Sequence, residues 1–267
     1  MAFNTILLFN VYHIWLNICH TLPFDSRKFI EIDSSSYSNK EYIFSFVISI
    51  NSKKTEQMKN RLVKNYFFIE AEKFPTSSTR SEQFFSFYNN HIKCIQTAQD
   101  MSLDHAFVFE DDVIFIDNWR AIVNEFIKNN DVDIIKFDRI PYNLLSDCPN
   151  HDNVYFYNGH NLACCTGGFY YSRRAINLML DRHKKLMTFI HKEKDACPED
   201  LMGYIQQPLE DKVYYSLPRI CIQDWYRQSS SLMQNKQHLK NLSDMQIEYY
   251  LPRYGKFYPE FINEKNN

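Results

Sequence analysis

Three consecutive carboxylates, Glu110 to Asp112, interrupt the apolar run FVFEDDVIF at Phe107 to Phe115. Adjacent carboxylates beside hydrophobic chain repel one another and resist desolvation, so a compensating charge must lie close to them. A divalent cation would supply that charge. Oxygen ligands favour the hard cations Mg²⁺ and Mn²⁺, which share their coordination shell with substrate phosphates. The alternative is that the acids cap the next turn or pair with Arg or Lys.

The chain geometry expected around the triplet is that of a strand. If the backbone stays extended, Glu110 and Asp112 share one face and Asp111 points to the other. Ligands bind beyond the carboxyl ends of strands in a parallel sheet, and the triplet arrives as the apolar stretch Ala106 to Phe109 ends. The sequence therefore places these carboxylates at a ligand-binding edge.

Strand-like and helix-like patterns alternate along the chain, which indicates an α/β fold. Continuous apolar runs are typical of strands that are buried on both faces. The expected strands are 42–50, 66–74, 107–115, 131–140 and 212–223, and the expected helices are 53–66, 77–101 (after a short loop) and 118–130, with a strand-to-helix unit at 166–186.

Composition bounds the class of protein. A chain of 267 residues with 45% hydrophobic content can bury one large domain, and its formal charge of -2 offers no basic field for nucleic acid. The five glycines allow neither a dinucleotide fingerprint nor a P-loop, and no CxxC or HExxH pattern is present. Seven cysteines are too few for a disulfide scaffold, although six would remain if Cys19 were cleaved away, an even number that permits disulfides without requiring them.

The first 24 residues contain no Asp, Glu, Lys or Arg and have an apolar centre, which resembles a secretory signal peptide. A signal anchor and a merely hydrophobic N-terminal element are the alternatives, because the segment is short and polar for a membrane span. The expected organisation is a signal peptide or short anchor at 1–24, a linker at 25–41, a folded domain at 42–235 and a C-terminal extension at 236–267. The expected location is the secretory pathway (endoplasmic reticulum or Golgi lumen) or outside the cell.

Five segments, in the right order, resemble motifs of glycosyltransferase family 25, which contains bacterial lipopolysaccharide galactosyltransferases and animal procollagen galactosyltransferases. The match runs from Tyr42 to Leu232. This sequence departs from the family pattern at two places. A turn with Lys53, Lys54 and Gln57 replaces a segment that is richer in Arg, and Asn90 replaces the usual Ser before His91. The segments are FVISINSKKTEQMKNRL, NNHIKCIQTA, HAFVFEDDVIF, CTGGFYYSRRAINLML and PRICIQDWYRQSSSL.

The resemblance implies a GT-A-like, Rossmann-type nucleotide-sugar fold with a mixed, mostly parallel central sheet flanked by helices. It implies transfer of a hexose from a UDP-sugar to a protein or glycan hydroxyl with inversion, assisted by Mn²⁺ or Mg²⁺. UDP-galactose is the favoured donor and UDP-glucose the next. Neither nucleic acid nor a membrane is an expected partner.

The resemblance also implies roles for individual residues. Asp112 and Glu110 would ligate the metal, and Asp200, with Glu199 beside it, would be the catalytic base, unless Asp200 simply caps a helix. Contacts to the donor nucleotide-sugar are expected from Ile50, Asn51, Lys53, His91, Asp111, Thr166, Gly167 and Gln223.

Several donor contacts have structural alternatives. Ile50 and Asn51 would also suit ordinary strand termination, and His91 would suit a packing role. Thr166 and Gly167 would also suit a tight turn. Two other functions stay open: a family-like fold that has lost catalysis and binds a glycan or protein, and a metal-dependent phosphoesterase.

Overall fold

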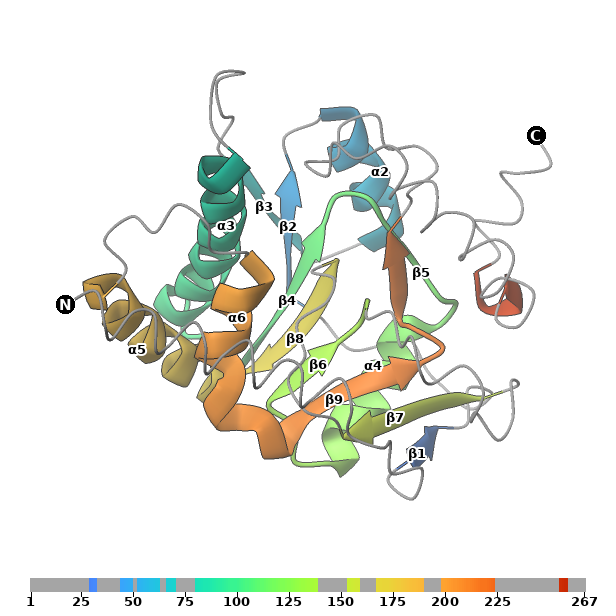
Figure 1. The fold of residues 1–267 in the computed structure, drawn as a ribbon. Helices are drawn as coiled ribbons and strands as arrows, with labels where there is room; N and C mark the ends of the chain where they lie inside the picture. The colour runs from blue at the N-terminus through green and yellow to red at the C-terminus, as the bar shows by residue number, and fades with distance from the viewer. Residues whose placement is uncertain are drawn as a thin grey trace.

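The computed structural model describes residues 29–32, 44–49, 52–62, 66–70, 80–138, 153–158, 167–189, 198–223 and 255–258. In this part of the chain an eight-stranded sheet has the order β1-β7-β9-β6-β8-β4-β2-β3, and β5 and β10 form a separate two-stranded ribbon (Figure 1). The strands are β1 (Phe29–Ile32), β2 (Ser45–Ser49), β3 (Tyr66–Glu70), β4 (His105–Glu110), β5 (Val113–Phe115), β6 (Ile134–Lys136), β7 (Val154–Asn158), β8 (Gly168–Ser172), β9 (Val213–Leu217) and β10 (Cys221–Gln223).

The large sheet is mixed. β2 runs parallel to β3 and β4, and β6 runs parallel to β9. β8 is antiparallel to both β4 and β6, and β7 is antiparallel to both β1 and β9. Six of the eight strands therefore point in one direction, with only β7 and β8 opposed, which confirms the expected mixed, mostly parallel sheet.

Helices cover both faces of the sheet. On one face α3 (Arg80–Asp100), α5 (Arg173–Phe189) and α6 (Pro198–Gln206) pack against one another (Figure 1). On the other face lie α2 (Ser52–Leu62), α4 (Trp119–Asn129) and the β5–β10 ribbon. The short 3-10 helices η2 (Gln207–Lys212) and η4 (Gly255–Phe257) complete the described elements. The alternation of strands and helices expected from the sequence is confirmed.

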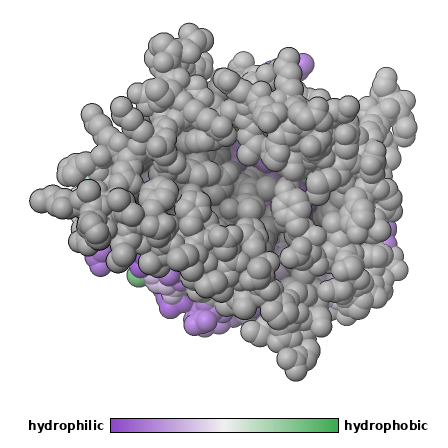
Figure 2. Space-filling model, viewed as in Figure 1, coloured by the Kyte–Doolittle hydropathy of each residue, from purple (hydrophilic) through white to green (hydrophobic). Residues whose placement is uncertain are grey.

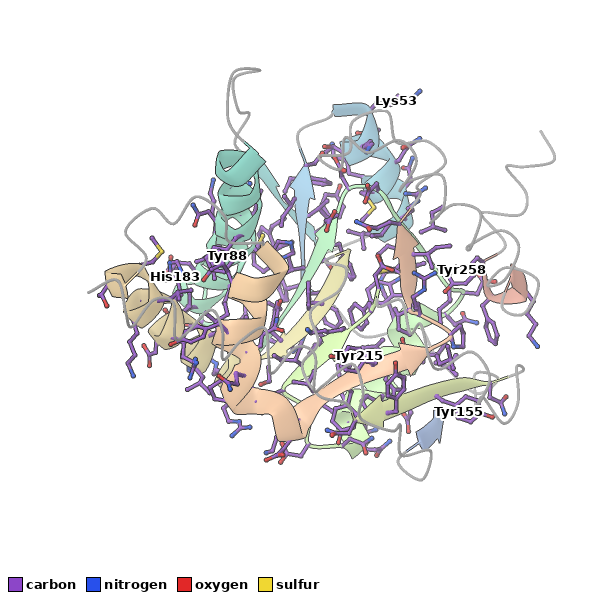
Figure 3. All side chains as sticks on the ribbon, in the orientation of Figure 1. Lys53, Tyr88, Tyr155, His183, Tyr215 and Tyr258 are labelled. Atoms are coloured by element: carbon purple, nitrogen blue, oxygen red, sulfur yellow. The ribbon has the colours of Figure 1, made fainter. Side chains whose placement is uncertain are left out.

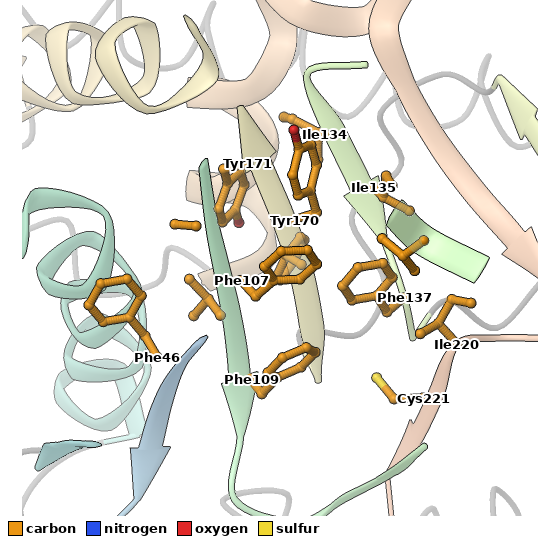
Figure 4. Close-up of a cluster of buried hydrophobic side chains, with 14 of the residues drawn as sticks. Phe46, Phe107, Phe109, Ile134, Ile135, Phe137, Tyr170, Tyr171, Ile220 and Cys221 are labelled. Atoms are coloured by element: carbon orange, nitrogen blue, oxygen red, sulfur yellow. The ribbon is translucent and has the colours of Figure 1, made fainter. Parts of the chain in front are cut away.

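Aromatic side chains fill the core between the sheet and α4. Phe107, Phe109 and Phe137 stack side by side on the sheet (Figure 4). Phe115 of β5 lies 4.9 Å from Phe109 and 4.7 Å from Trp119, measured between ring centroids. Such contacts add to the free energy gained from burial. They also fix β5 against the end of β4, so the residues between the two strands must turn.

The run FVFEDDVIF is therefore two strands rather than the single expected strand. β4 ends at Glu110, Asp111 and Asp112 form a turn, and β5 starts at Val113 in the separate ribbon. The physical reason is that the charged side chains of the turn lie outside the apolar sheet, whereas Phe115 packs in the core on Phe109 and Trp119. The expected strand at 212–223 also divides into β9 and β10, with Pro218, which has no N–H to donate to a sheet, between them.

Two segments outside the expected domain belong to it. Phe29–Ile32, in the expected linker, pairs with β7 as an edge strand. In the expected C-terminal extension, Tyr258 is fully buried and its hydroxyl donates to the carbonyl of Arg219 at 2.6 Å. The structural domain is thus wider than 42–235, because these segments add a strand and a core side chain.

The described residues that are visible on the face in Figure 2 are mostly hydrophilic. Figure 2 shows hydrophilic colouring among the described residues at the lower left of the visible face. Met101 and Met187 are the large hydrophobic side chains that are exposed in the described part. Among the helices described, none combines the length and apolar character that crossing a membrane requires. The expected signal peptide at 1–24 lies outside the described residues.

Candidate functional site

The acidic turn, Glu110 to Asp112, lies at the carboxyl edge of the parallel strands. Ile48 of β2 is in register with Glu110 of β4, so Ser49 at the end of β2 is beside the turn. α2 begins at Ser52 on the same edge, where Figure 3 shows Lys53 at the top of the molecule. A strand edge of this kind is where open α/β sheets bind ligands.

Asp111 is held by two neighbouring elements. The hydroxyl of Ser49 donates to Oδ2 of Asp111 at 2.5 Å, and the hydroxyl of Thr55 in α2 donates to Oγ of Ser49 at 2.9 Å. Nζ of Lys54 lies 3.7 Å from Oδ1 of Asp111. The carboxylate therefore has a fixed orientation and a positive neighbour.

Asp112 shares that positive neighbour. Nζ of Lys54 lies 3.9 Å from Oδ2 of Asp112, and these side chains are largely buried, with 21% of Lys54 and 11% of Asp112 exposed. Unit charges about 4 Å apart attract by several kcal/mol when partly shielded from water. The alternative that the acids pair with a basic residue is thus what the structure shows for Asp111 and Asp112.

Glu110 is engaged from a different direction. Nε2 of Gln223, in β10, donates to Oε2 of Glu110 at 2.9 Å. The backbone N–H of Glu110 donates to the carbonyl of Gly167 at 3.0 Å. Lys54 thus contacts Asp111 and Asp112, whereas Gln223 contacts Glu110, and the metal role expected of Asp112 and Glu110 stays a prediction.

Gly167 lies at the centre of this edge. A Cβ placed there would be 2.5 Å from Oδ2 of Asp138 and 3.1 Å from both Cγ of Gln223 and Cγ1 of Val113. The position requires glycine because no side chain fits among these atoms. The structure therefore brings Gly167 and Gln223, two of the expected donor contacts, together with the acidic turn.

Asp138 forms a buried ion pair behind Gly167. Nη1 of Arg219 donates to Oδ1 of Asp138 at 3.0 Å, and 0% of the Asp138 side chain is exposed. Burial raises the pKa of Asp138 to about 6, although the charge and hydrogen bond of Arg219 act in the opposite direction. Burial also raises the pKa of the Cys221 thiol well above its usual range, so this cysteine is a packed, un-ionised side chain.

The donor set fits a hard cation. Mg²⁺ and Mn²⁺ are commonly held by one or two carboxylates together with substrate phosphates and water. One oxygen of Asp111 and one of Asp112 lie within 4 Å of the ammonium of Lys54, which neutralises them in this structure. Within the described residues no group of three or more His, Cys, Asp or Glu side chains is arranged as a metal site.

His91 and Lys53 occupy contrasting positions. His91 is 0% exposed and meets the ring of Phe169 edge to face, with 5.7 Å between centroids. Burial lowers the pKa of His91 to about 3, so its imidazole is neutral at ordinary pH. This environment fits the packing alternative better than contact with a phosphate. Lys53 is exposed at the start of α2.

The remaining expected site residues are not placed. Ile50, Asn51 and Thr166 lie outside the described residues. Glu199 and Asp200 are in the first turn of α6, but their side chains lie outside the described part, so their catalytic role stays a prediction.

Sequence reasoning missed four residues of this edge: Ser49, Thr55, Asp138 and Arg219. A signal was available for Asp138, which follows the apolar run of β6 just as the acidic triplet follows β4. No pattern in the sequence indicates that Arg219 is its partner, 81 residues away.

No protein-family model and no curated protein matches the chain. Among solved structures, the chain is similar to a glycosyltransferase involved in the glycosylation of the major capsid of PBCV-1, with a TM-score of 0.39, 12% identity, and coverage of 74% of this chain and 98% of that one. It is also similar to A197 from STIV, with a TM-score of 0.38, 11% identity, and coverage of 66% and 81% respectively. TM-scores below 0.5 at such identities define no family, so any functional assignment depends on the site itself.

Proposed function

We propose that this protein is a glycosyltransferase that moves a hexose from a UDP-sugar to a hydroxyl of a protein or glycan, with inversion at the anomeric carbon and with the assistance of Mn²⁺ or Mg²⁺. UDP-galactose is the favoured donor and UDP-glucose the next. The segments that resemble family 25 motivate the class. A GT-A-like arrangement, the secretory location and the signal peptide belong to the same proposal.

One observation carries the proposal: at the carboxyl edge of a mostly parallel sheet, Asp111 and Asp112 both contact one positive charge, the ammonium of Lys54. Nucleotide-sugar chemistry needs positive charge there, because the departing diphosphate gains negative charge as the glycosidic bond breaks. When bound, a divalent cation would supply that charge stabilisation. Asp112 and Glu110 are the proposed ligands of that cation, and Asp111 lies between them in the same turn.

The chain's own residues supply the other requirements. Ser49 and Thr55 orient Asp111, and Gln223 orients Glu110. Lys54, together with exposed Lys53 at the first turn of α2, offers positive charge to the diphosphate, as a point charge rather than with the paired donors of Arg. Asp200 is the proposed base that takes the proton of the attacking hydroxyl.

The test is a donor screen that measures UDP release from several UDP-sugars, with and without Mn²⁺, for the wild type and Asp112→Asn. We expect Mn²⁺-dependent release in the wild type and a loss of at least about 100-fold in the variant, the scale of removing one strong electrostatic contact to the transition state. Lys59→Gln, a charge change at a half-exposed position of α2, is the control and should keep wild-type activity. Unchanged activity in Asp112→Asn would refute the metal role.

A second function is favoured by one observation, which is that Lys54 already neutralises Asp111 and Asp112. A catalytically inactive module that binds a glycan or protein needs no divalent cation at this edge. That reading predicts saturable glycan or protein binding that is insensitive to Mn²⁺, with no UDP release from any donor.

A further inference from the structure

The ion pair between Asp138 and Arg219 has a large unfavourable desolvation free energy, because both charges are buried. Only 0% and 4% of the two side chains are exposed. Within the described residues, Oδ2 of Asp138 accepts no hydrogen bond even though it is buried. A buried pair with an unsatisfied oxygen adds little to overall stability, and an apolar pair of similar volume is often at least as stable. The location of the pair, at the end of β6 and the start of β10, indicates that it contributes to the geometry of this edge instead of to stability.

The pair joins the ends of two strands. Asp138 follows the end of β6 at Lys136, and Arg219 precedes the start of β10 at Cys221. Beside the pair, the N–H of Cys221 donates to the carbonyl of Phe137 at 3.3 Å. The ion pair and this hydrogen bond together determine where β10 begins relative to the sheet.

β10 in turn contacts both ends of the acidic turn. Its residue Gln223 is in register with Val113, which directly follows Asp112. The side chain of Gln223 also donates to Glu110, which directly precedes Asp111. A displacement of β10 would therefore move the whole acidic turn.

Gly167 provides a second connection between the pair and the turn. Oδ2 of Asp138 packs over Gly167, whose carbonyl accepts the N–H of Glu110. Arg219 fixes the orientation of the Asp138 carboxylate, so the oxygen that faces Gly167 cannot rotate away without breaking the pair. The pair thus fixes the turn through β10 on one side and through Gly167, which directly precedes β8, on the other.

We propose that Asp138 and Arg219 form a positioning pair, which holds β10 and Gly167 so that the acidic turn keeps the geometry needed to stabilise the departing donor diphosphate. Because Asp138 is fully buried, the pair acts through Gln223, Val113 and Gly167 rather than by touching substrate. The part that concerns diphosphate binding rests on the proposed glycosyltransferase function. The part that concerns the position of the turn does not.

The main variant is the double substitution Asp138→Leu with Arg219→Met, which keeps the packing volume and removes both charges. We expect its unfolding midpoint to match the wild type. We expect hydrogen exchange of peptides that cover 110–116 and 221–223 to be about tenfold faster, because the ribbon is less firmly held. With UDP-sugar, kcat should fall more than KM rises, since an incorrectly positioned turn impairs the transition state most.

A control removes a less buried ion pair, Asp133 and Arg174 at the other end of β6 and β8, by Asp133→Asn with Arg174→Met. It should leave exchange in the two segments and kcat unchanged. If the double variant Asp138→Leu with Arg219→Met does not fold, the single variant Arg219→Lys is measured instead. Lys keeps the positive charge but lacks the planar guanidinium geometry of Arg.

Each outcome decides the proposal. Faster local exchange at unchanged overall stability supports it. A folded variant with wild-type exchange in both segments overturns it, whatever the activity. A wild type that releases no UDP and binds no Mn²⁺ contradicts the proposed function, while the exchange measurement still decides whether the pair positions the turn.

Discussion

Oδ2 of Asp138 lies 2.5 Å from the point where a side chain at Gly167 would begin. Arg219 holds that carboxylate, and the pair is buried, so it has no room to withdraw. A glycine and a carboxylate 29 positions apart in the sequence are therefore coupled sterically at the edge that carries the acidic turn.

Gly167→Ala should destabilise the protein because the new methyl group overlaps Asp138 and crowds Gln223 and Val113. The expected loss in the free energy of unfolding is about 1–3 kcal/mol, the range for overpacking a filled interior. Denaturant unfolding measures it. Combining Gly167→Ala with Asp138→Ala removes the overlapping oxygen and should give a smaller loss than the sum of the two single variants. Additive losses would show that the methyl group is accommodated elsewhere.

Lys54→Met should tighten the binding of Mn²⁺ and weaken the binding of UDP. Lys54 neutralises Asp111 and Asp112, so removing its charge leaves the carboxylates available to a cation, and removes a positive charge from the diphosphate. We expect a roughly tenfold gain for Mn²⁺, from the Coulomb energy of a divalent ion near a unit charge at this edge. Titration calorimetry measures both affinities.

Lys59→Met is the control for this experiment, because Lys59 is on the same helix and pairs with Glu56 instead. It should change neither affinity by more than about twofold, given the weak effect of screened surface charges. An unchanged or weaker Mn²⁺ affinity in Lys54→Met would contradict the competition between Lys54 and the metal.

His91 should make the protein less stable in acid. Its pKa is about 3 in the folded state and 6.5 in the unfolded state, so only the unfolded state takes up a proton between these values. Stability from this residue is therefore present above about pH 6.5 and is lost as the pH falls toward 3, with a slope of up to about 1.4 kcal/mol per pH unit.

Comparing wild type with His91→Gln isolates that slope, which urea unfolding between pH 4 and 8 would measure. Lys93→Gln, an exposed change in the same helix, should keep the wild-type slope. Equal slopes for wild type and His91→Gln would indicate that the imidazole is protonated in the folded protein.

Asp138 should give a pH dependence of the opposite sign. Its pKa is raised to about 6 from 3.8, so between these values the folded state holds the proton more tightly than the unfolded state. The contribution of this group to stability therefore increases as the pH falls from about 6 toward 3.8. Asp138→Asn should lack this increase in urea unfolding, whereas Asp100→Asn, an exposed change, should retain it.

The sequence alone determined the alternation of the central strands and helices and the location of the acids at a strand end, but not β1, β7 or α6. Apolar runs such as the one through Phe107 and Phe109 and the helical pattern that contains His91 are local signals, because side-chain periodicity depends only on neighbouring residues. The local pattern also indicated that the acids at 110 to 112 follow a strand, but it could not show that the chain turns at Asp111.

Tertiary structure decided the partners. The turn exists because Phe115 packs on Phe109 and Trp119, and that contact depends on α4. The pairing of Lys54 with the acids, of Gln223 with Glu110 and of Arg219 with Asp138 joins positions 57 to 113 residues apart. Such contacts arise from the packing of distant elements and leave no periodic mark on the chain, so only the folded molecule reveals which charge neutralises which.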